Sequence, residues 1–93
     1  RNLEFHPTDS EHILAYSKRE GENLILVIVN LDPIHAHEST VHWDLGKLGL
    51  EDGVFHVQDL LSRDEYQWST HTYVRLDPTR PVGRVAHIAR VKL

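Results

Sequence analysis

Six consecutive apolar residues, from Leu24 to Val29, are the feature that most constrains how this chain folds. The run reads Leu-Ile-Leu-Val-Ile-Val, whereas a strand with one face in water alternates apolar and polar residues. Asp32-Pro33 follows and ends the strand, because proline has no N–H to donate to a sheet. We therefore predict a central strand over residues 23–31 that is buried on both faces.

The rest of the chain consists of short apolar or alternating runs between turn-forming residues, and no stretch keeps the spacing of a long helix. Hairpin turns are expected at 18–22, around Gly21, and between 65–68 and 72–76. Residues 44–50 have the spacing of one helical turn, and the two prolines of 77–83 indicate a loop. The predicted strands cover residues 3–5, 13–17, 23–31, 39–44, 54–59, 65–68, 72–76 and 85–91.

The length of 93 residues is enough for one domain with one hydrophobic core. About eight short strands at regular spacing predict an all-β fold, an antiparallel β-sandwich of the Greek-key type that spans residues 1–93. The sequence has no methionine, and Arg1-Asn2-Leu3-Glu4-Phe5 already reads as structure. We therefore expect a fragment of a longer protein.

The net charge of −4, with acidic and basic residues interspersed, argues against binding to nucleic acid or to a membrane, since both favour clustered Lys and Arg. No segment is apolar enough to span a bilayer, and we expect no signal peptide. Cysteine is absent, which excludes disulfides and thiolate metal sites and fits a reducing compartment. We expect a cytoplasmic protein without a cofactor.

Histidine is abundant, with eight residues, and His35-Ala36-His37 is the one local cluster. Residues two apart in an extended segment point the same way, so both imidazoles can reach one divalent metal, with Glu38 adding an oxygen. The segment follows Asp32-Pro33, however, and a solvated loop is the more common explanation. We therefore assign no metal ligand, and we expect His87, inside a strand, to be structural.

Acidic residues offer no recognisable catalytic pair. Glycosidases place two carboxylates about 5 to 10 Å apart. The candidates here lie at turns or strand ends, where aspartate binds nearby backbone donors: Asp44, Asp59, Asp64 and Asp77. A nucleophile elbow, a phosphate-binding glycine loop and a dinucleotide fingerprint are also absent. We predict no catalytic residue in this chain.

Four aromatic side chains are candidates for stacking on sugar rings. Trp43 shares a face with Val41, which predicts a core position. Tyr66 and Trp68 share a face of a short strand and, with Tyr73, are the better candidates for exposure. Large aromatics in a domain of this size more often belong to the core, so we assign no substrate-binding residue.

Several segments, taken in order, resemble one enzyme family. The run NLILVIVNLDP (23–33) resembles the strand that opens the main sheet of the C-terminal domain in glycoside hydrolase family thirteen, the α-amylase family. Further segments resemble the end of the bacterial α-1,4-glucan:maltose-1-phosphate maltosyltransferases: HPTD (6–9), ILAYSK (13–18), DLGKLGL (44–50), VQDLL (57–61), YQW (66–68), YVRLDP (73–78) and AHI (86–88). Two loops depart, since Ala36 separates histidines that are expected to be adjacent, and 79–85 is lengthened, with Val85 where a proline usually stands.

The resemblance implies a parent enzyme that transfers maltosyl units from α-maltose-1-phosphate to an α-1,4-glucan with retention of configuration. Its nucleophile and its acid/base carboxylate belong to a (β/α)₈ barrel that precedes this domain, so none of them falls on these residues. The expected partners are that barrel and, through the parent, α-glucan. Docking is expected near Leu3 and Phe5, with the outer face of 13–17 extending the patch.

Two alternatives stay open. One is an independent starch- or glycogen-binding module, which exposure of Tyr66, Trp68 and Tyr73 on one surface favours. The other is the same domain from a trehalose synthase, a branching enzyme or an amylase, which share the central strand but are expected to lack the YVRLDP and AHI segments.

Overall fold

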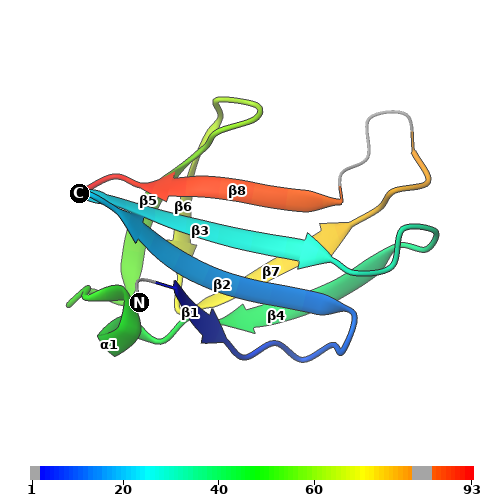
Figure 1. Cartoon of the computed structure of the whole chain (residues 1–93), viewed down its shortest axis with the longest axis horizontal. Coiled ribbons are helices and arrows are strands. Elements are labelled where there is room, and N and C mark those ends of the chain that lie inside the picture. Colours follow the sequence, from blue (N-terminus) through cyan, green and yellow to red (C-terminus); the bar gives the residue numbers. More distant parts are fainter. Residues whose placement is uncertain (1–2, 81–84) are drawn as a thin grey trace.

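The computed structural model describes residues 3–80 and 85–93, and it places eight strands and one short helix within them (Figure 1). All strand pairs are antiparallel. The elements are β1 (Leu3–His6), β2 (Ile13–Glu20), β3 (Asn23–Asn30), β4 (His37–His42), α1 (Leu45–Leu48), β5 (Val54–Asp59), β6 (Glu65–Ser69), β7 (His71–Leu76) and β8 (Ala86–Val91).

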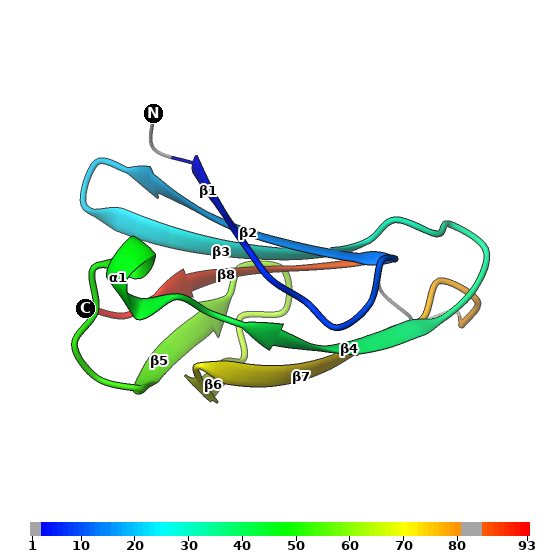
Figure 2. The ribbon, with the colours of Figure 1, turned by 90° about the horizontal axis from the view of Figure 1, so that it is seen from below.

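The strands form two layers, as Figure 2 shows. One sheet has six strands in the order β1-β2-β3-β8-β5-β6, and the other pairs β4 with β7. Strand β7 follows β6 in the chain but lies in the second sheet, and β8 then returns to the first sheet between β3 and β5. Strands β5 to β8 therefore have the connectivity of a Greek key. The predicted all-β sandwich is confirmed.

Strand β3 is buried on both faces, as the apolar run predicts. Leu24, Leu26 and Ile28 point between the sheets and have almost no exposed surface. Ile25 and Val27 point to the other face and are also buried, beneath side chains of β2 and β8 that lie opposite them in the register. This strand therefore holds the centre of the larger sheet.

The chain crosses between the layers directly after β1. The backbone O of Pro7 accepts from the N–H of His42 (2.8 Å), and Thr8 forms a bridge with Val41. One segment therefore closes an edge of the larger sheet and then an edge of the smaller one.

The first hairpin turn is tighter than predicted. Strand β2 runs on to Glu20, which pairs with Asn23, so that only Gly21 and Glu22 form the turn. The charged residues of 18–20, which favoured a turn from sequence, lie on a strand that extends toward solvent. Gly21 takes a positive φ of 63°, which a two-residue loop commonly requires.

The predicted hairpin between 65–68 and 72–76 is wrong. Strand β6 pairs with β5 in the larger sheet, whereas β7 pairs with β4 in the smaller one. Thr70 is the single residue between the two strands, too few for a two-residue hairpin loop. Its N–H donates to Gly53 O (3.1 Å) and its O accepts from the N–H of Trp43 (2.8 Å), so the chain changes sheet there.

The predicted helical turn forms as α1 at one end of the sandwich (Figure 1). Asp44 caps it by accepting from the N–H of Lys47 (3.2 Å), and Gly49 ends it. Of the four residues of α1, Leu48 alone is fully buried, and it belongs to the core. Of the predicted 77–83 loop and the lengthened segment 79–85, residues 81–84 lie outside the described part of the chain.

Candidate functional site

The acidic residues considered for a hydrolytic pair occupy separate turns and caps. Asp44 caps α1. Asp77 accepts from Thr79, whose side chain and N–H hold the pKa of Asp77 below its ordinary value. Asp64 is exposed in the turn between β5 and β6. The structure brings none of these three carboxylates into a shared site.

Asp59 is buried at the end of β5 and organises the turn that follows it. Its Oδ1 accepts from the N–H groups of Leu61 (2.8 Å) and Ser62 (3.0 Å). Its Oδ2 lies 3.3 Å from Nδ1 of His87. The expected structural role of His87 is supported by this contact, which links β8 to the β5–β6 turn.

Tyr66, Trp68 and Tyr73 line one shallow groove of about 260 Å³, together with Val74, Arg75 and His87. Tyr66 is 38% exposed and Tyr73 is 61% exposed. Tyr66 and Trp68 lie on the same face of β6, as predicted, opposite Val57 and Phe55 of β5. The structure therefore brings the three sequence-selected aromatics together at the edge between β6 and β7.

Trp68 is nevertheless part of the packing between the sheets. Its ring stacks on Trp43, with centroids 6.2 Å apart and planes 12° from parallel, and it meets the ring of His87 edge-on at 6.5 Å. Trp43 is 4% exposed, which confirms its predicted core position. Of the three aromatic residues, therefore, only the two tyrosines are exposed in the groove.

Tyr73 lies on the outer face of β7, where its hydroxyl donates to Glu38 of β4. This hydrogen bond, together with the nearby negative charge, raises the pKa of the Tyr73 phenol. Glu38 therefore lies beside Tyr73 on the outer face of the small sheet. It does not join His35 and His37, as the sequence had suggested it could.

The histidines of the 35–37 cluster converge on Asp32. Nδ1 of His35 lies 3.0 Å from Asp32 Oδ2, and Nε2 of His37 lies 2.9 Å from the same oxygen. The contact with His37 is the main reason why the pKa of Asp32 lies well below its usual range, and the N–H of Ile34 contributes next. Both imidazoles therefore contact one carboxylate oxygen, whereas the sequence analysis preferred a solvated loop.

His12 also reaches this cluster, which the sequence analysis missed. Its ring stacks on that of His37, with centroids 4.0 Å apart. The register of the β2–β3 hairpin carries the missing signal: Ile13 lies opposite Asn30, so the next pair outward is His12 and Leu31, and Leu31 N–H donates to His12 O (2.8 Å). If the sequence analysis had placed the turn at Gly21-Glu22, this register would have paired His12 with Leu31, the residue before Asp32.

A second chain of polar groups lies on the outer face of the small sheet. Nε2 of His42 lies 2.8 Å from Asp9 Oδ1, and Nδ1 of His42 lies 2.9 Å from Nδ1 of His71. The two histidines are cross-strand neighbours in the β4–β7 pair. Asp9 and His71 are exposed and His42 is half-buried, and together they tie the crossing segment after β1 to the small sheet.

The two outer faces of the sandwich differ in chemistry. The outer face of β4 and β7 is polar and carries Glu38, Thr40, His42, His71, Tyr73 and Arg75. The outer face of the larger sheet is mainly apolar over β1, β2, β3 and β8, where the register aligns Leu3, Phe5, Leu14, Tyr16, Ile25, Val27, Val29, Ala86 and Ile88. Lys18 and Arg90 lie on the same face, on either side of Ile25. Phe5 is 56% exposed, as the expected docking patch requires, and its ring lies 6.1 Å from that of Tyr16.

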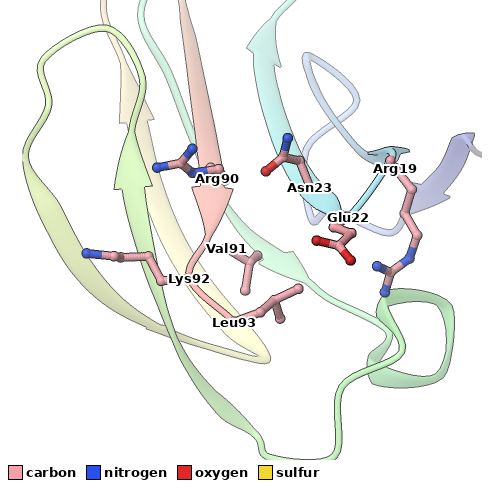
Figure 3. Close-up of a pocket in the computed structure, with 8 residues that line it drawn as sticks. Arg19, Glu22, Asn23, Arg90, Val91, Lys92 and Leu93 are labelled. Atoms are coloured by element: carbon pink, nitrogen blue, oxygen red, sulfur yellow. The ribbon is translucent and has the colours of Figure 1, made fainter.

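An open hollow of about 730 Å³ lies where the β2–β3 turn meets the end of β8 (Figure 3). Three cationic side chains border it: Arg19, Arg90 and Lys92. Each has a partner elsewhere, since Arg19 donates to Leu48 O (2.6 Å), Arg90 to Gln58 (3.2 Å) and Lys92 to Glu65 (3.0 Å). The hollow therefore lacks a converging set of reactive groups.

Within residues 3–80 and 85–93, no helix has the length and apolar character needed to cross a membrane.

Comparison with proteins of known sequence shows that this chain is similar to one part of much longer enzymes. The chain is 47% identical, over 97% of its length, to the α-1,4-glucan:maltose-1-phosphate maltosyltransferase 1 of Streptomyces coelicolor. It is 36% identical, over 98% of its length, to the enzyme of the same name from Mycobacterium tuberculosis. It spans only 14% and 13% of these two relatives.

The fold has a counterpart among solved structures. A noncanonic maltogenic α-amylase from Thermotoga neapolitana superposes with a TM-score of 0.62 at 19% identity, over 98% of this chain and 20% of that one. The model of the family described as "GLGE, C-terminal" matches residues 5–91. The match covers almost the whole chain, with the second half of β1 and all of the other seven strands. The chain therefore belongs to the GLGE C-terminal domain family.

Proposed function

We propose that this chain is the non-catalytic C-terminal domain of an α-1,4-glucan:maltose-1-phosphate maltosyltransferase, and that its parent builds α-glucan. The observation that carries the proposal is the family match over residues 5–91, joined to 36–47% identity with enzymes of that name. Because the chain corresponds to 13–14% of those relatives, the reaction belongs to the rest of the parent.

In this proposal the parent moves a maltosyl unit from α-maltose-1-phosphate to the non-reducing end of an α-1,4-glucan. Retention of configuration needs one carboxylate as nucleophile and a second as general acid and base. Both belong to a (β/α)₈ barrel outside this chain, at the C-terminal ends of its strands. Asp44, Asp59 and Asp77 already serve a cap and two turns, which supports the absence of a catalytic role here.

The contribution of this domain is to dock against that barrel and support its fold. The outer face of the larger sheet is the surface best suited to the task, because it is mainly apolar across four strands, with Lys18 and Arg90 beside Ile25, while the opposite face of the sandwich is polar. Interfaces between domains of one chain bury about 600 to 1,500 Å². Phe5, at the edge of this face, is more than half exposed and is a suitable contact residue.

A pair of substitutions in the full-length parent tests the docking role. Phe5→Asp places a charge in the proposed interface, and Leu61→Asp places one at a similarly exposed apolar side chain, 62% against 56%, in the β5–β6 turn. We expect Phe5→Asp to lower the melting temperature of the parent by several degrees, because burial of an unpaired charge is unfavourable, and Leu61→Asp to leave it unchanged. Equal melting temperatures for the two variants would place the interface elsewhere.

The reaction is tested separately with the unaltered parent. Incubation with α-maltose-1-phosphate and maltohexaose is expected to release phosphate and lengthen the acceptor by two glucose units per transfer. Conversion of maltose to trehalose, formation of branches, or simple hydrolysis would instead assign the parent to a trehalose synthase, a branching enzyme or an amylase. The isolated 93-residue chain is expected to release no phosphate.

A second candidate function is a surface contact for α-glucan at the groove of Tyr66, Trp68 and Tyr73. The favouring observation is that all three line one groove with Arg75, which offers hydrogen-bond donors beside the exposed rings. Trp68 is held against Trp43, so the two tyrosines would form the contact surface. Affinity is expected to be weak, because two partly exposed rings bury little sugar surface.

Titration of the isotopically labelled chain with maltoheptaose, followed by NMR, tests this second function. Saturable shifts centred on Tyr66 and Tyr73, which disappear in Tyr73→Ala but persist in Leu61→Ala, would establish the contact. Shifts that are absent or scattered at millimolar ligand would leave only the docking role.

A further inference from the structure

Three histidine side chains gather around the carboxylate of Asp32 at the end of β3. Asp32 follows β3, His37 opens β4, His35 lies between them, and His12 precedes β2. One ligand atom from each of His12, Asp32 and His37 lies within 4.8 Å of the other two. In the part of the chain that the structure describes, this is the one group of three acidic or histidine side chains with such a spacing.

Backbone contacts hold the carboxylate of Asp32 in a fixed orientation. Its Oδ1 accepts from the N–H groups of Ile34 (2.9 Å) and His35 (3.2 Å), which leaves Oδ2 to face the imidazoles. The N–H of Asp32 in turn donates to Oδ1 of Asn30 (2.9 Å), a buried residue of β3. The oxygen that meets the histidines is therefore positioned by the backbone before any ligand arrives.

Backbone hydrogen bonds and strand pairing also hold His12 and His37 in position. The His12 backbone is fixed to the end of β3 through its O and the N–H of Leu31 (2.8 Å). His37 belongs to β4 and pairs with Leu76 of β7. Neither ring depends on a long unsupported loop, so little conformational freedom remains to be lost when a ligand binds.

We propose that His12, Asp32 and His37 bind one divalent transition-metal ion, with zinc as the expected ion. Imidazole nitrogens and a carboxylate oxygen are zinc ligands, whereas calcium and magnesium require mostly oxygen. Zinc bonds of about 2.0 to 2.2 Å at tetrahedral angles place ligand atoms about 3.3 Å from each other. The 2.9 Å between His37 Nε2 and Asp32 Oδ2 is close to that separation.

A water molecule can take the fourth position, because His35, whose Nδ1 lies 3.0 Å from Asp32 Oδ2, is not among the three residues whose ligand atoms lie close to one another. Binding releases any proton that His12 or His37 carries, since only neutral imidazole is a ligand. The ion replaces the hydrogen bond between His37 and Asp32 with two bonds to the metal. No electron transfer is involved, because zinc has no redox chemistry.

A metal ion at this position links the two sheets. Asp32 extends from β3 of the larger sheet, and His37 belongs to β4 of the smaller one. An ion that binds the folded chain and not the unfolded chain stabilises the fold by mass action. The proposed site is therefore structural, and it does not depend on the maltosyltransferase assignment of the parent.

Calorimetric titration of the metal-free 93-residue chain with zinc tests the proposal. We expect one zinc per chain and a melting temperature that rises with zinc concentration. Asp32→Asn, His12→Gln and His37→Gln are each expected to weaken binding more than about 100-fold, because loss of even an outer-shell partner reduces affinity about 10- to 100-fold. Asp32→Asn keeps the Oδ1 acceptor for the backbone, so this variant is designed to retain the loop.

Two control variants separate this site from binding to exposed histidines in general. His42→Gln removes the centre of the second histidine chain, and His56→Gln removes an exposed histidine of β5. Both should bind zinc like the unaltered chain. Cobalt should give the visible absorption bands of a tetrahedral ion in the unaltered chain and in both controls, and none in Asp32→Asn.

Three results would overturn the proposal: no binding at millimolar zinc, loss of binding in His42→Gln, or full binding in both Asp32→Asn and His12→Gln. NMR spectra of each variant establish that it is folded. If His37→Gln unfolds, the other two ligand variants decide the outcome.

Discussion

Trp43 and Trp68 stack almost in parallel across the sandwich, with ring centroids 6.2 Å apart, although they belong to different layers. Trp43 follows β4 of the smaller sheet, whereas Trp68 lies in β6 of the larger one. The indole N–H of Trp43 donates to Oγ1 of Thr72 (3.2 Å), so its polar atom is satisfied inside the core. The pair therefore joins the two layers near the point where the chain passes from β6 in the larger sheet to β7 in the smaller one.

The first prediction follows from this stacking. Trp43→Ala should lower the free energy of unfolding by about 3 to 5 kcal/mol, because it leaves a cavity beneath Trp68. Trp43→Phe should have a smaller effect of about 1 to 2 kcal/mol, since it keeps a ring but loses the hydrogen bond to Thr72. Urea unfolding measures both, with Tyr73→Ala as the exposed aromatic control. Comparable losses for Trp43→Ala and Tyr73→Ala would contradict a bridging role.

A second prediction concerns His6, which is buried in neutral form. The N–H of Asp44 donates to Nδ1 (3.0 Å), so the ring proton resides on Nε2 and is donated to Ser17 Oγ (2.8 Å). Burial, aided by the positive charge of Lys47, lowers the pKa of His6 below 6.5. The unfolded chain therefore takes up this proton first as the pH falls.

The contribution of His6 to stability is consequently complete above about pH 6.5 and decreases as the pH falls toward the lower pKa of the folded state. An NMR titration of the His6 ring should give a midpoint below 6.5. In His6→Gln, the part of the pH dependence due to this residue should vanish. A midpoint above 6.5 would show that the imidazolium is accommodated in the fold.

A third prediction compares two glycines with positive φ. Gly49 ends α1 with φ 71°, and a Cβ there would lie 2.9 Å from Arg19 Nη2. Gly21 has φ 63° with no atom near its Cβ position. Gly21→Ala should therefore cost about 1 to 2 kcal/mol from backbone strain alone, and Gly49→Ala should cost more because Arg19 must move from Leu48 O. Thermal unfolding of the two variants should rank them in that order; the reverse order would mean that Arg19 adapts freely.

Sequence alone predicted where strands form better than it predicted which strands pair. The unbroken run of β3 and the alternation of Phe55 and Val57 in β5 each reflect local burial, which a residue pattern records directly. Pairing depends on how the chain turns. Thr70 donates to Gly53, just before β5, and accepts from Trp43, just after β4, and no composition rule distinguishes such a residue from the tip of a hairpin.

The candidate sites show the same division. Tyr66 and Trp68 were placed on one face because a strand has a period of two residues. The same period allowed His35 and His37 to reach one ligand, although a solvated loop was preferred, and in the structure both contact Asp32. His12 was missed because its proximity follows from the β2–β3 register, and that register was uncertain by the length of the turn around Gly21.

The last prediction concerns Asn30, the buried residue that ends β3. Its Nδ2 donates to the backbone O of His35 (3.0 Å) and of Leu76 (3.0 Å), while its Oδ1 accepts from the N–H of Asp32. Asn30→Asp replaces the Nδ2 donor with a second acceptor that faces two carbonyl oxygens, and a buried carboxylate oxygen in that position is strongly unfavourable.

We expect Asn30→Asp to lose at least about 3 kcal/mol of unfolding free energy at pH 8, a size typical of a broken buried network. Burial raises the pKa of such a carboxyl, so the folded variant takes up a proton before the unfolded one does, and the deficit should shrink as the pH falls toward 5. Asn30→Ala should show a loss without this pH dependence, because it leaves the same carbonyls unpaired but adds no titratable group. Urea unfolding of both variants at the two pH values measures the difference. A stable Asn30→Asp at pH 8 would mean that the loop rearranges, and zinc binding at Asp32 should then be lost with it.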